Sequence, residues 1–268
     1  MGGMWTLAWP GRPAPVVCHR PGRAWWTLAR ARRAHRRALR LGDAGRRDLA
    51  VLAAAEAVRL FEAAGAPREL AAARMTLGDL RFQLGEHAAA VAAFSGAGDA
   101  GLLPLGNCLR VLGRFAEAEF ALAAAPARPA TRNALGVLCR ETGRYDEAAR
   151  HYAAALADPA LHGVVHHNLA GLAHARGRPE DALIAALTAL VWHARERGCG
   201  SPEVAADAAV LGAIQLGLGR LDDAAASLGR ARDIWQRRYG PDHHETRLCR
   251  RGLAAVEHAR RAVATPPG

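Results

Sequence analysis

One spacing of small residues recurs five times along this chain of 268 residues, and it restricts the possible folds more than any other feature. Each copy begins with Leu and a small residue, followed seven residues later by Gly. An Ala follows five residues after that Gly, an apolar residue follows nine residues after it, and a second Ala follows twelve residues after it. The clearest copy consists of Leu135, Gly136, Gly143, Ala148, Tyr152 and Ala155, and the other copies begin at Leu77, Leu105, Leu169 and Leu211. A pattern with this period predicts stacked helical units.

Each position of the template has a packing reason. A small residue after Leu lets two antiparallel helices approach closely, as at Gly136. The later Gly adopts the left-handed backbone that ends the first helix. The remaining three positions lie on one face of a second helix, which should pack inward. Acidic pairs such as Asp146 and Glu147 open several second helices and complement the helix dipole.

This template resembles that of the tetratricopeptide repeat family over residues 68–262. The resemblance implies an all-α, right-handed superhelical solenoid of antiparallel helix pairs, with five repeats in 68–240. The small residues after Leu are 28, 30, 34 and 42 residues apart, and 34 is the usual period. The longest interval predicts two extra helical turns from Val191 to Arg197, before Ser201 caps the next helix. Such long units look similar to the kinesin light chain subclass and its bacterial relatives.

The ends of the chain depart from the template. We expect residues 24–64 to form a degenerate, Arg-rich helix pair and residues 241–263 to form a capping helix, followed by a tail at 264–268. Residues 1–23, with four Pro and four Gly, are expected to be disordered or an over-extended gene start.

The family resemblance implies that first helices line a concave groove that binds a partner protein or peptide. Asn and Arg there can hold the backbone or carboxylate of an extended peptide. The alternative is an ordinary solvated helix surface. Because the chain has no Lys, it lacks the carboxylate clamp of some chaperone-binding relatives. The predicted groove residues are Asp79, Gln83, Asn107, Arg110, Asn133, Arg140, His167 and His174.

Four histidines, His162, His166, His167 and His174, could include an i, i+4 metal-binding pair. No Cys, Asp or Glu lies between Leu161 and Pro179, so we expect structural or groove-facing histidines, and neither metal nor cofactor.

All 36 basic residues are Arg, which indicates a GC-rich, actinobacterial type of genome. Residues 1–50 nevertheless hold 11 Arg against two acids, a local charge of +9. This Arg-rich start suggests an alternative role as a nucleic-acid accessory factor. Trp25 and Trp26 are expected to cover the apolar end of the solenoid.

The chain lacks the Walker Gly-Lys loop, GxSxG and HExxH motifs, so we do not expect an enzyme. Its scattered cysteines, its short apolar runs and the lack of a signal-like start predict a cytoplasmic protein without a membrane segment. The expected function is a protein-interaction adaptor or scaffold. A further alternative is a regulatory module of a bacterial signalling or transcription system that acts on a separate effector.

Overall fold

A computed structural model describes residues 23–264, which form thirteen α-helices and one short 3-10 helix, η1 (Pro159–Leu161), with no strand in this range. The predicted all-α fold is confirmed. Apart from residues 23 and 264, the predicted disordered start and C-terminal tail lie outside the described part. Contacts divide the chain into two compact units, Met1–Leu80 and Arg81–Gly268.

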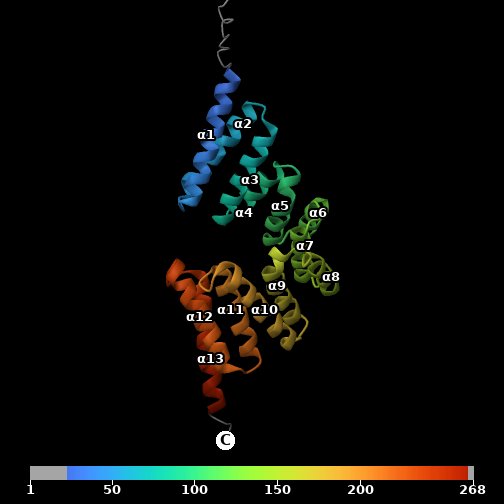
Figure 1. Cartoon of the computed structure of the whole chain (residues 1–268), viewed down its shortest axis with the longest axis vertical. Helices are drawn as coiled ribbons and strands as arrows, with labels where there is room; N and C mark the ends of the chain where they lie inside the picture. Colours follow the sequence, from blue (N-terminus) through green and yellow to red (C-terminus); the bar gives the residue numbers. More distant parts are fainter. Residues whose placement is uncertain (1–22, 265–268) are drawn as a thin grey trace, which may run out of the picture. The chain divides into compact units, whose positions relative to one another are not determined.

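The first unit contains α1 (Arg23–Asp43), α2 (Arg47–Ala63) and most of α3 (Pro67–Gln83) (Figure 1). Helices α1 and α2 pack against each other and are joined by a turn in which Gly45 has a φ of 72°. Small side chains allow this close approach, and one aromatic ring fills the centre. The core residues are Ala31, Ala34, Ala57, Phe61 and Ala73.

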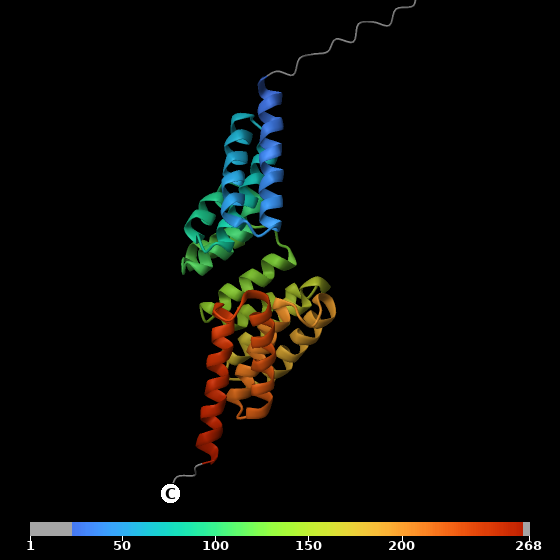
Figure 2. The same cartoon turned by 90° about the vertical axis from the view of Figure 1, so that its left-hand side faces the viewer.

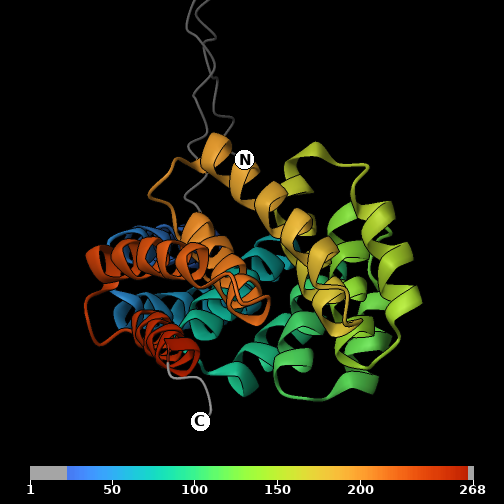
Figure 3. The same ribbon diagram turned by 90° about the horizontal axis from the view of Figure 1, so that it is seen from below.

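The second unit continues as consecutive helices that pack in chain order (Figures 2 and 3). Its helices are α4 (His87–Ser95), α5 (Asp99–Val111), α6 (Phe115–Ala124), α7 (Pro129–Glu141), α8 (Tyr145–Ala155), α9 (His162–Ala175), α10 (Pro179–Arg197), α11 (Pro202–Gly217), α12 (Leu221–Tyr239) and α13 (His244–Ala264). The first helices of successive pairs, α5, α7, α9, α11 and α13, also contact one another in this order. The unit is therefore a solenoid of helix pairs.

The small residue after Leu lies at the crossing of the two helices in the pairs α5/α6, α7/α8 and α11/α12, as the template predicts. A Cβ atom on Gly136 would lie 2.5 Å from Cε1 of Tyr152, the apolar residue of the same copy. In the same way, a Cβ atom on Gly106 would overlap the side chain of Leu122, and a Cβ atom on Gly212 would overlap the side chain of Leu228. The second Gly of the template also behaves as expected, since Gly143 ends α7 with a φ of 78°.

Helix lengths account for the unequal repeat intervals. The second helices α4, α6 and α8 have only 9, 10 and 11 residues, whereas α10 and α12 have 19 each. Helix α10 extends to Arg197, which confirms the extra turns expected there. The Oγ of Ser201 then accepts a hydrogen bond of 3.3 Å from the backbone N–H of Val204, which confirms the predicted cap.

The core consists of contiguous apolar clusters between successive helix pairs. Cys108, Cys139 and Cys249 are buried in it, at positions where a small apolar residue suits the packing. No helix in residues 23–264 is long and apolar enough to cross a membrane.

Candidate partner-binding face

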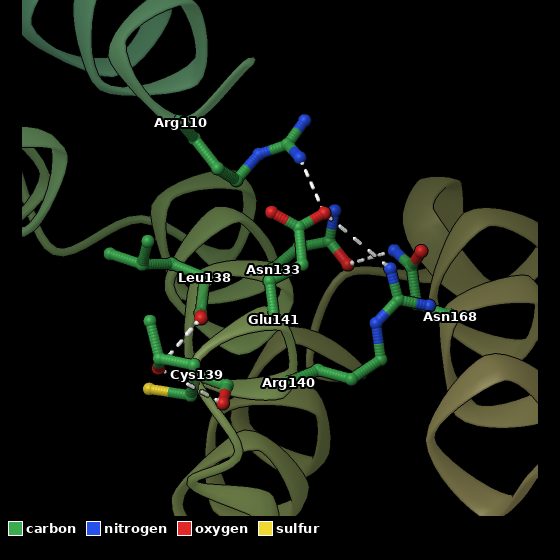
Figure 4. Close-up of polar contacts among 8 residues, drawn as sticks. Arg110, Asn133, Leu138, Cys139, Arg140, Glu141 and Asn168 are labelled. Atoms are coloured by element: carbon green, nitrogen blue, oxygen red, sulfur yellow. Dashed lines mark hydrogen bonds and ion pairs between the residues drawn. The ribbon is translucent and has the colours of Figure 1, made fainter. Parts of the chain in front are cut away.

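A row of polar side chains joins consecutive first helices of the second unit (Figure 4). We call it the polar row. It consists of Arg110 on α5, Asn133, Arg140 and Glu141 on α7, and His167 and Asn168 on α9. These residues lie far apart in the sequence, and the stacking of first helices brings them together.

Two arginines of the row share one carboxylate. Nη1 of Arg110 lies 2.6 Å from Oε1 of Glu141, and Nη2 of Arg140 lies 3.8 Å from the same oxygen (Figure 4). A single carboxylate neutralises only one of the two guanidinium groups. This part of the row therefore carries an excess positive charge.

Arg140 reaches across to the next first helix. A Cβ atom on Gly171 of α9 would lie only 2.2 Å from Nη1 of Arg140. Because Gly171 has no side chain, the guanidinium can extend over α9. A larger residue at this position would displace Arg140.

An amide pair forms the next contact between α7 and α9. Nδ2 of Asn168 donates a hydrogen bond of 2.9 Å to Oδ1 of Asn133 (Figure 4). Each side-chain amide offers both donors and an acceptor. This bond uses one N–H of Asn168 and the side-chain oxygen of Asn133. The oxygen of Asn168 and the NH₂ group of Asn133 can therefore form further hydrogen bonds.

His167 is held by a buried carboxylate from α11. Nδ1 of His167 donates to Oδ1 of Asp207 at 2.7 Å, and Nδ1 of His193 on α10 donates to Oδ2 at 2.6 Å. An ionised carboxylate carries no proton, so it can only accept hydrogen bonds, and both histidines act as donors. Asp207 is fully buried, so it connects three helices from inside the core. Gly163 leaves room for the ring of His193, since a Cβ there would lie 2.5 Å from Nε2.

The row is within reach of a binding partner. The exposed fractions of the Arg110, Arg140 and His167 side chains are 21%, 26% and 34%. Beneath the row, Tyr152 is fully buried, and Oη has no hydrogen-bond partner among the described residues. Burial raises the pKa of Tyr152 to about 12.

Four of the eight predicted groove residues lie in the polar row: Arg110, Asn133, Arg140 and His167. Asn107 is half-buried on α5, and His174 is exposed in the last turn of α9. Gln83 is exposed at the end of α3, and Asp79 is exposed in the first unit. The assignment of these residues to partner binding stays a prediction.

The remaining histidines have local roles. Nε2 of His162 donates a hydrogen bond of 3.0 Å to the carbonyl oxygen of Leu156. Burial, together with the neighbouring His162, lowers the pKa of His166. Within residues 23–264, no group of three His, Cys, Asp or Glu is placed to hold a metal ion.

Sequence reasoning missed Glu141, Asn168, His193 and Asp207. One signal could have identified Asp207, because it interrupts the Ala-rich stretch from Ala205 to Ala208, where helical periodicity predicts burial. The other three are ordinary polar helix residues in the sequence, and only tertiary structure shows their contacts.

The paired helices and the shared template define a helical-repeat solenoid protein. A family model described as tetratricopeptide repeat matches residues 205–262. This segment is therefore similar in sequence to the tetratricopeptide repeat. No curated protein matches the chain in sequence.

Solved structures show a similar fold over most of the chain. PilW, a widely conserved type IV pilus biogenesis factor, matches with a TM-score of 0.61 at 16% identity, over 81% of this chain and 96% of that chain. A tetratricopeptide repeat protein from Parabacteroides merdae gives 0.55 at 14% identity, over 85% and 99%. The APC/C hetero-tetramer Cut9–Hcn1 gives 0.57 at 18% identity, over 86% of this chain but 48% of that chain. This chain therefore spans about half the length of that last relative. These likenesses concern the fold.

Proposed function

We propose that this chain is a protein-interaction adaptor and that the polar row receives an extended segment of a partner protein. One observation carries the proposal: partly exposed Arg and Asn side chains from three successive first helices are joined by polar contacts from α5 to α7 and from α7 to α9, with His167 beside them on α9. Solenoids of this kind offer extended surfaces to their partners. The tetratricopeptide-repeat fold supports an interaction role in general, and we propose no catalytic step.

The chemistry of the row suits an extended peptide with an acidic group. Arg110 and Arg140 share only Glu141, so a carboxylate of the partner can pair with the guanidinium that Glu141 leaves underneutralised. Asn133 and Asn168 can bind peptide amide groups, because side-chain amides match the donor and acceptor of the backbone. The partner would lie across α5, α7 and α9.

The test is affinity capture from the native cell extract, read by mass spectrometry, with the Arg110→Ala/Arg140→Ala double variant. We expect this variant to lose at least about 90% of the specific partner, because two charge-assisted contacts are removed. Helix content by circular dichroism should not change, since both side chains lie on the surface of the helices.

A matched control is Arg144→Ala/Arg176→Ala. These two arginines are also ion-paired, with Glu119 and Asp146, but they lie at the helix ends and outside the polar row. The control should capture the partner as the wild type does. Retained capture by the Arg110→Ala/Arg140→Ala variant would move the site elsewhere, and equal loss in both variants would remove the support for a specific row.

A further inference from the structure

A second charged surface lies on α1, within the first unit. Four of its arginines, Arg33, Arg36, Arg37 and Arg40, are exposed, and we call them the arginine stripe. With about 100° between successive helical residues, all four fall within an arc of roughly 100°, and Trp26 lies in the same arc. The buried Ala31, Ala34 and Ala38 lie on the opposite side and pack inward.

The stripe differs from its neighbouring arginines in its ion pairs. Arg30 pairs with Glu56 at 3.3 Å, and Arg32 pairs with Glu69 at 2.8 Å. No ion pair between described residues involves the stripe. A GC-rich genome explains why these residues are Arg and not Lys. It does not explain why Glu56 and Glu69 pair with the arginines at the two edges of the stripe and leave the stripe itself without an ion pair.

Two exposed tryptophans stand at the beginning of the same helix. Trp25 and Trp26 are 52% and 62% exposed, and their rings meet edge to face with centroids 4.8 Å apart. The expectation that they would cover the apolar end does not account for so much open ring surface. An exposed indole on the same helix face as guanidinium groups without ion pairs is suited to stacking on a nucleobase while the guanidinium groups bind phosphates.

We infer that α1 binds single-stranded nucleic acid, with the arginine stripe on successive phosphates and Trp26 stacked on a base. The surface from Trp26 to Arg40 extends about 21 Å along the helix, enough for several nucleotides. This inference is independent of the polar row, because it uses another unit and another ligand chemistry.

The same observations disfavour an anionic membrane as the ligand. A helix that lies on a membrane inserts an apolar face between the lipids. The apolar face of α1 already packs in the core of the first unit, through Ala31 and Ala34. Its outward face is cationic along most of its length. An acidic peptide would pair with the stripe, but it would leave the indoles without a role.

The test measures binding of a fluorescein-labelled dT12 oligonucleotide to the full chain by fluorescence anisotropy, over a range of salt concentrations. Four phosphate contacts predict a slope of about −3 for log affinity against log salt, which is a loss of roughly 50-fold between 50 and 200 mM. Replacing the stripe by Arg33→Gln/Arg36→Gln/Arg37→Gln/Arg40→Gln should weaken binding at least about tenfold and abolish most of the slope. Trp26→Ala should weaken binding about tenfold and leave the slope unchanged.

The matched control changes four exposed arginines of the second unit, as Arg195→Gln/Arg230→Gln/Arg237→Gln/Arg251→Gln. It removes the same charge and should reduce the affinity for dT12 less than about threefold, since these residues lie outside the stripe. If the fourfold stripe variant does not fold, Arg37→Gln alone should reduce the slope by about 0.7.

Three results would overturn the inference. The first is failure of the wild-type chain to bind dT12. The second is an equal loss of affinity in the stripe and control variants, which would indicate a response to net charge alone. The third is stripe-dependent binding of phosphatidylglycerol vesicles or a polyglutamate peptide that is tighter than binding of dT12.

Discussion

At the scale of single residues, the crossing points of the helix pairs are the most restricted positions. Gly136 has no side chain, and the ring of Tyr152 occupies the space that a Cβ atom would need. The two residues belong to one copy of the template, so their sizes are matched within the repeat. Other glycines of the chain lack this restriction: a Cβ on Gly229 of α12 would meet nothing within 4 Å.

Gly136→Leu should therefore destabilise the fold strongly. Overpacking of a core typically costs about 1–3 kcal/mol, and a branched side chain at a crossing should reach the upper end of this range. Thermal unfolding followed by circular dichroism gives the measurement. The control Gly229→Leu adds the same atoms in open space and should be neutral or stabilise by up to about 1 kcal/mol, because Leu favours helix over Gly. Equal melting temperatures of the two variants would contradict the crossing assignment.

At the scale of the secondary-structure elements, the helices of the second unit are held by two kinds of contact. Most pairs rely on apolar packing of small residues, as in the cluster of Ala170, Ala182 and Ala186. Helices α9, α10 and α11 have an additional polar link through Asp207, which accepts hydrogen bonds from His167 and His193. A buried carboxylate is tolerated here because both of its oxygens are bonded.

Asp207→Ala should loosen these three helices. The substitution removes two hydrogen bonds to a charged group and leaves the buried His193 without its acceptor, so we expect a loss of about 2–4 kcal/mol in the free energy of unfolding by urea. The effect should concentrate in α9–α11, where amide hydrogen exchange should accelerate.

A surface carboxylate provides the comparison. The side chain of Asp233 on α12 is 49% exposed and pairs with the adjacent Arg232, so Asp233→Ala should cost less than about 0.5 kcal/mol. A similarly small change for Asp207→Ala would show that the buried link contributes nothing to the stability of these helices.

At the scale of the whole molecule, the second unit ends with an unpaired helix. Helix α13 packs on the last helix pair, where Cys249 joins the cluster of Ile234 and Trp235, and Val256 packs with Leu228. In a repeat array each element contacts only its neighbours, and a terminal element keeps the last apolar surface from water. We propose this capping role for helix α13.

A chain that ends at Gly240 should therefore be less stable and more prone to self-association than the full chain. Loss of the contacts made by Cys249 and Val256 exposes apolar surface worth about 2–3 kcal/mol, which corresponds to a fall of about 5–10 °C in melting temperature. A chain that ends at Ala264 keeps α13 and should melt like the full chain. Scanning calorimetry and analytical ultracentrifugation would measure both effects, and an unchanged melting temperature for the chain ending at Gly240 would exclude a capping role.

The sequence alone determined the class of fold, the register of the repeats and the close helix crossings. These features depend on local periodicity and on residue size, as the pairing of Gly136 with Tyr152 illustrates. It also identified the extension of α10 to Arg197 and the Ser201 cap, because both follow from residues adjacent in the chain.

Only the tertiary structure decided which polar residues meet. Arg110 and Glu141 are 31 residues apart, Asn133 and Asn168 are 35 apart, and His167 and Asp207 are 40 apart. Such contacts depend on the offset and rotation of one first helix against the next, which the packing of the intervening second helix determines. Helical periodicity shows the face of the helix on which a side chain lies, but it does not show which residue of the next helix lies opposite. For this reason only half of the predicted groove residues belong to the polar row.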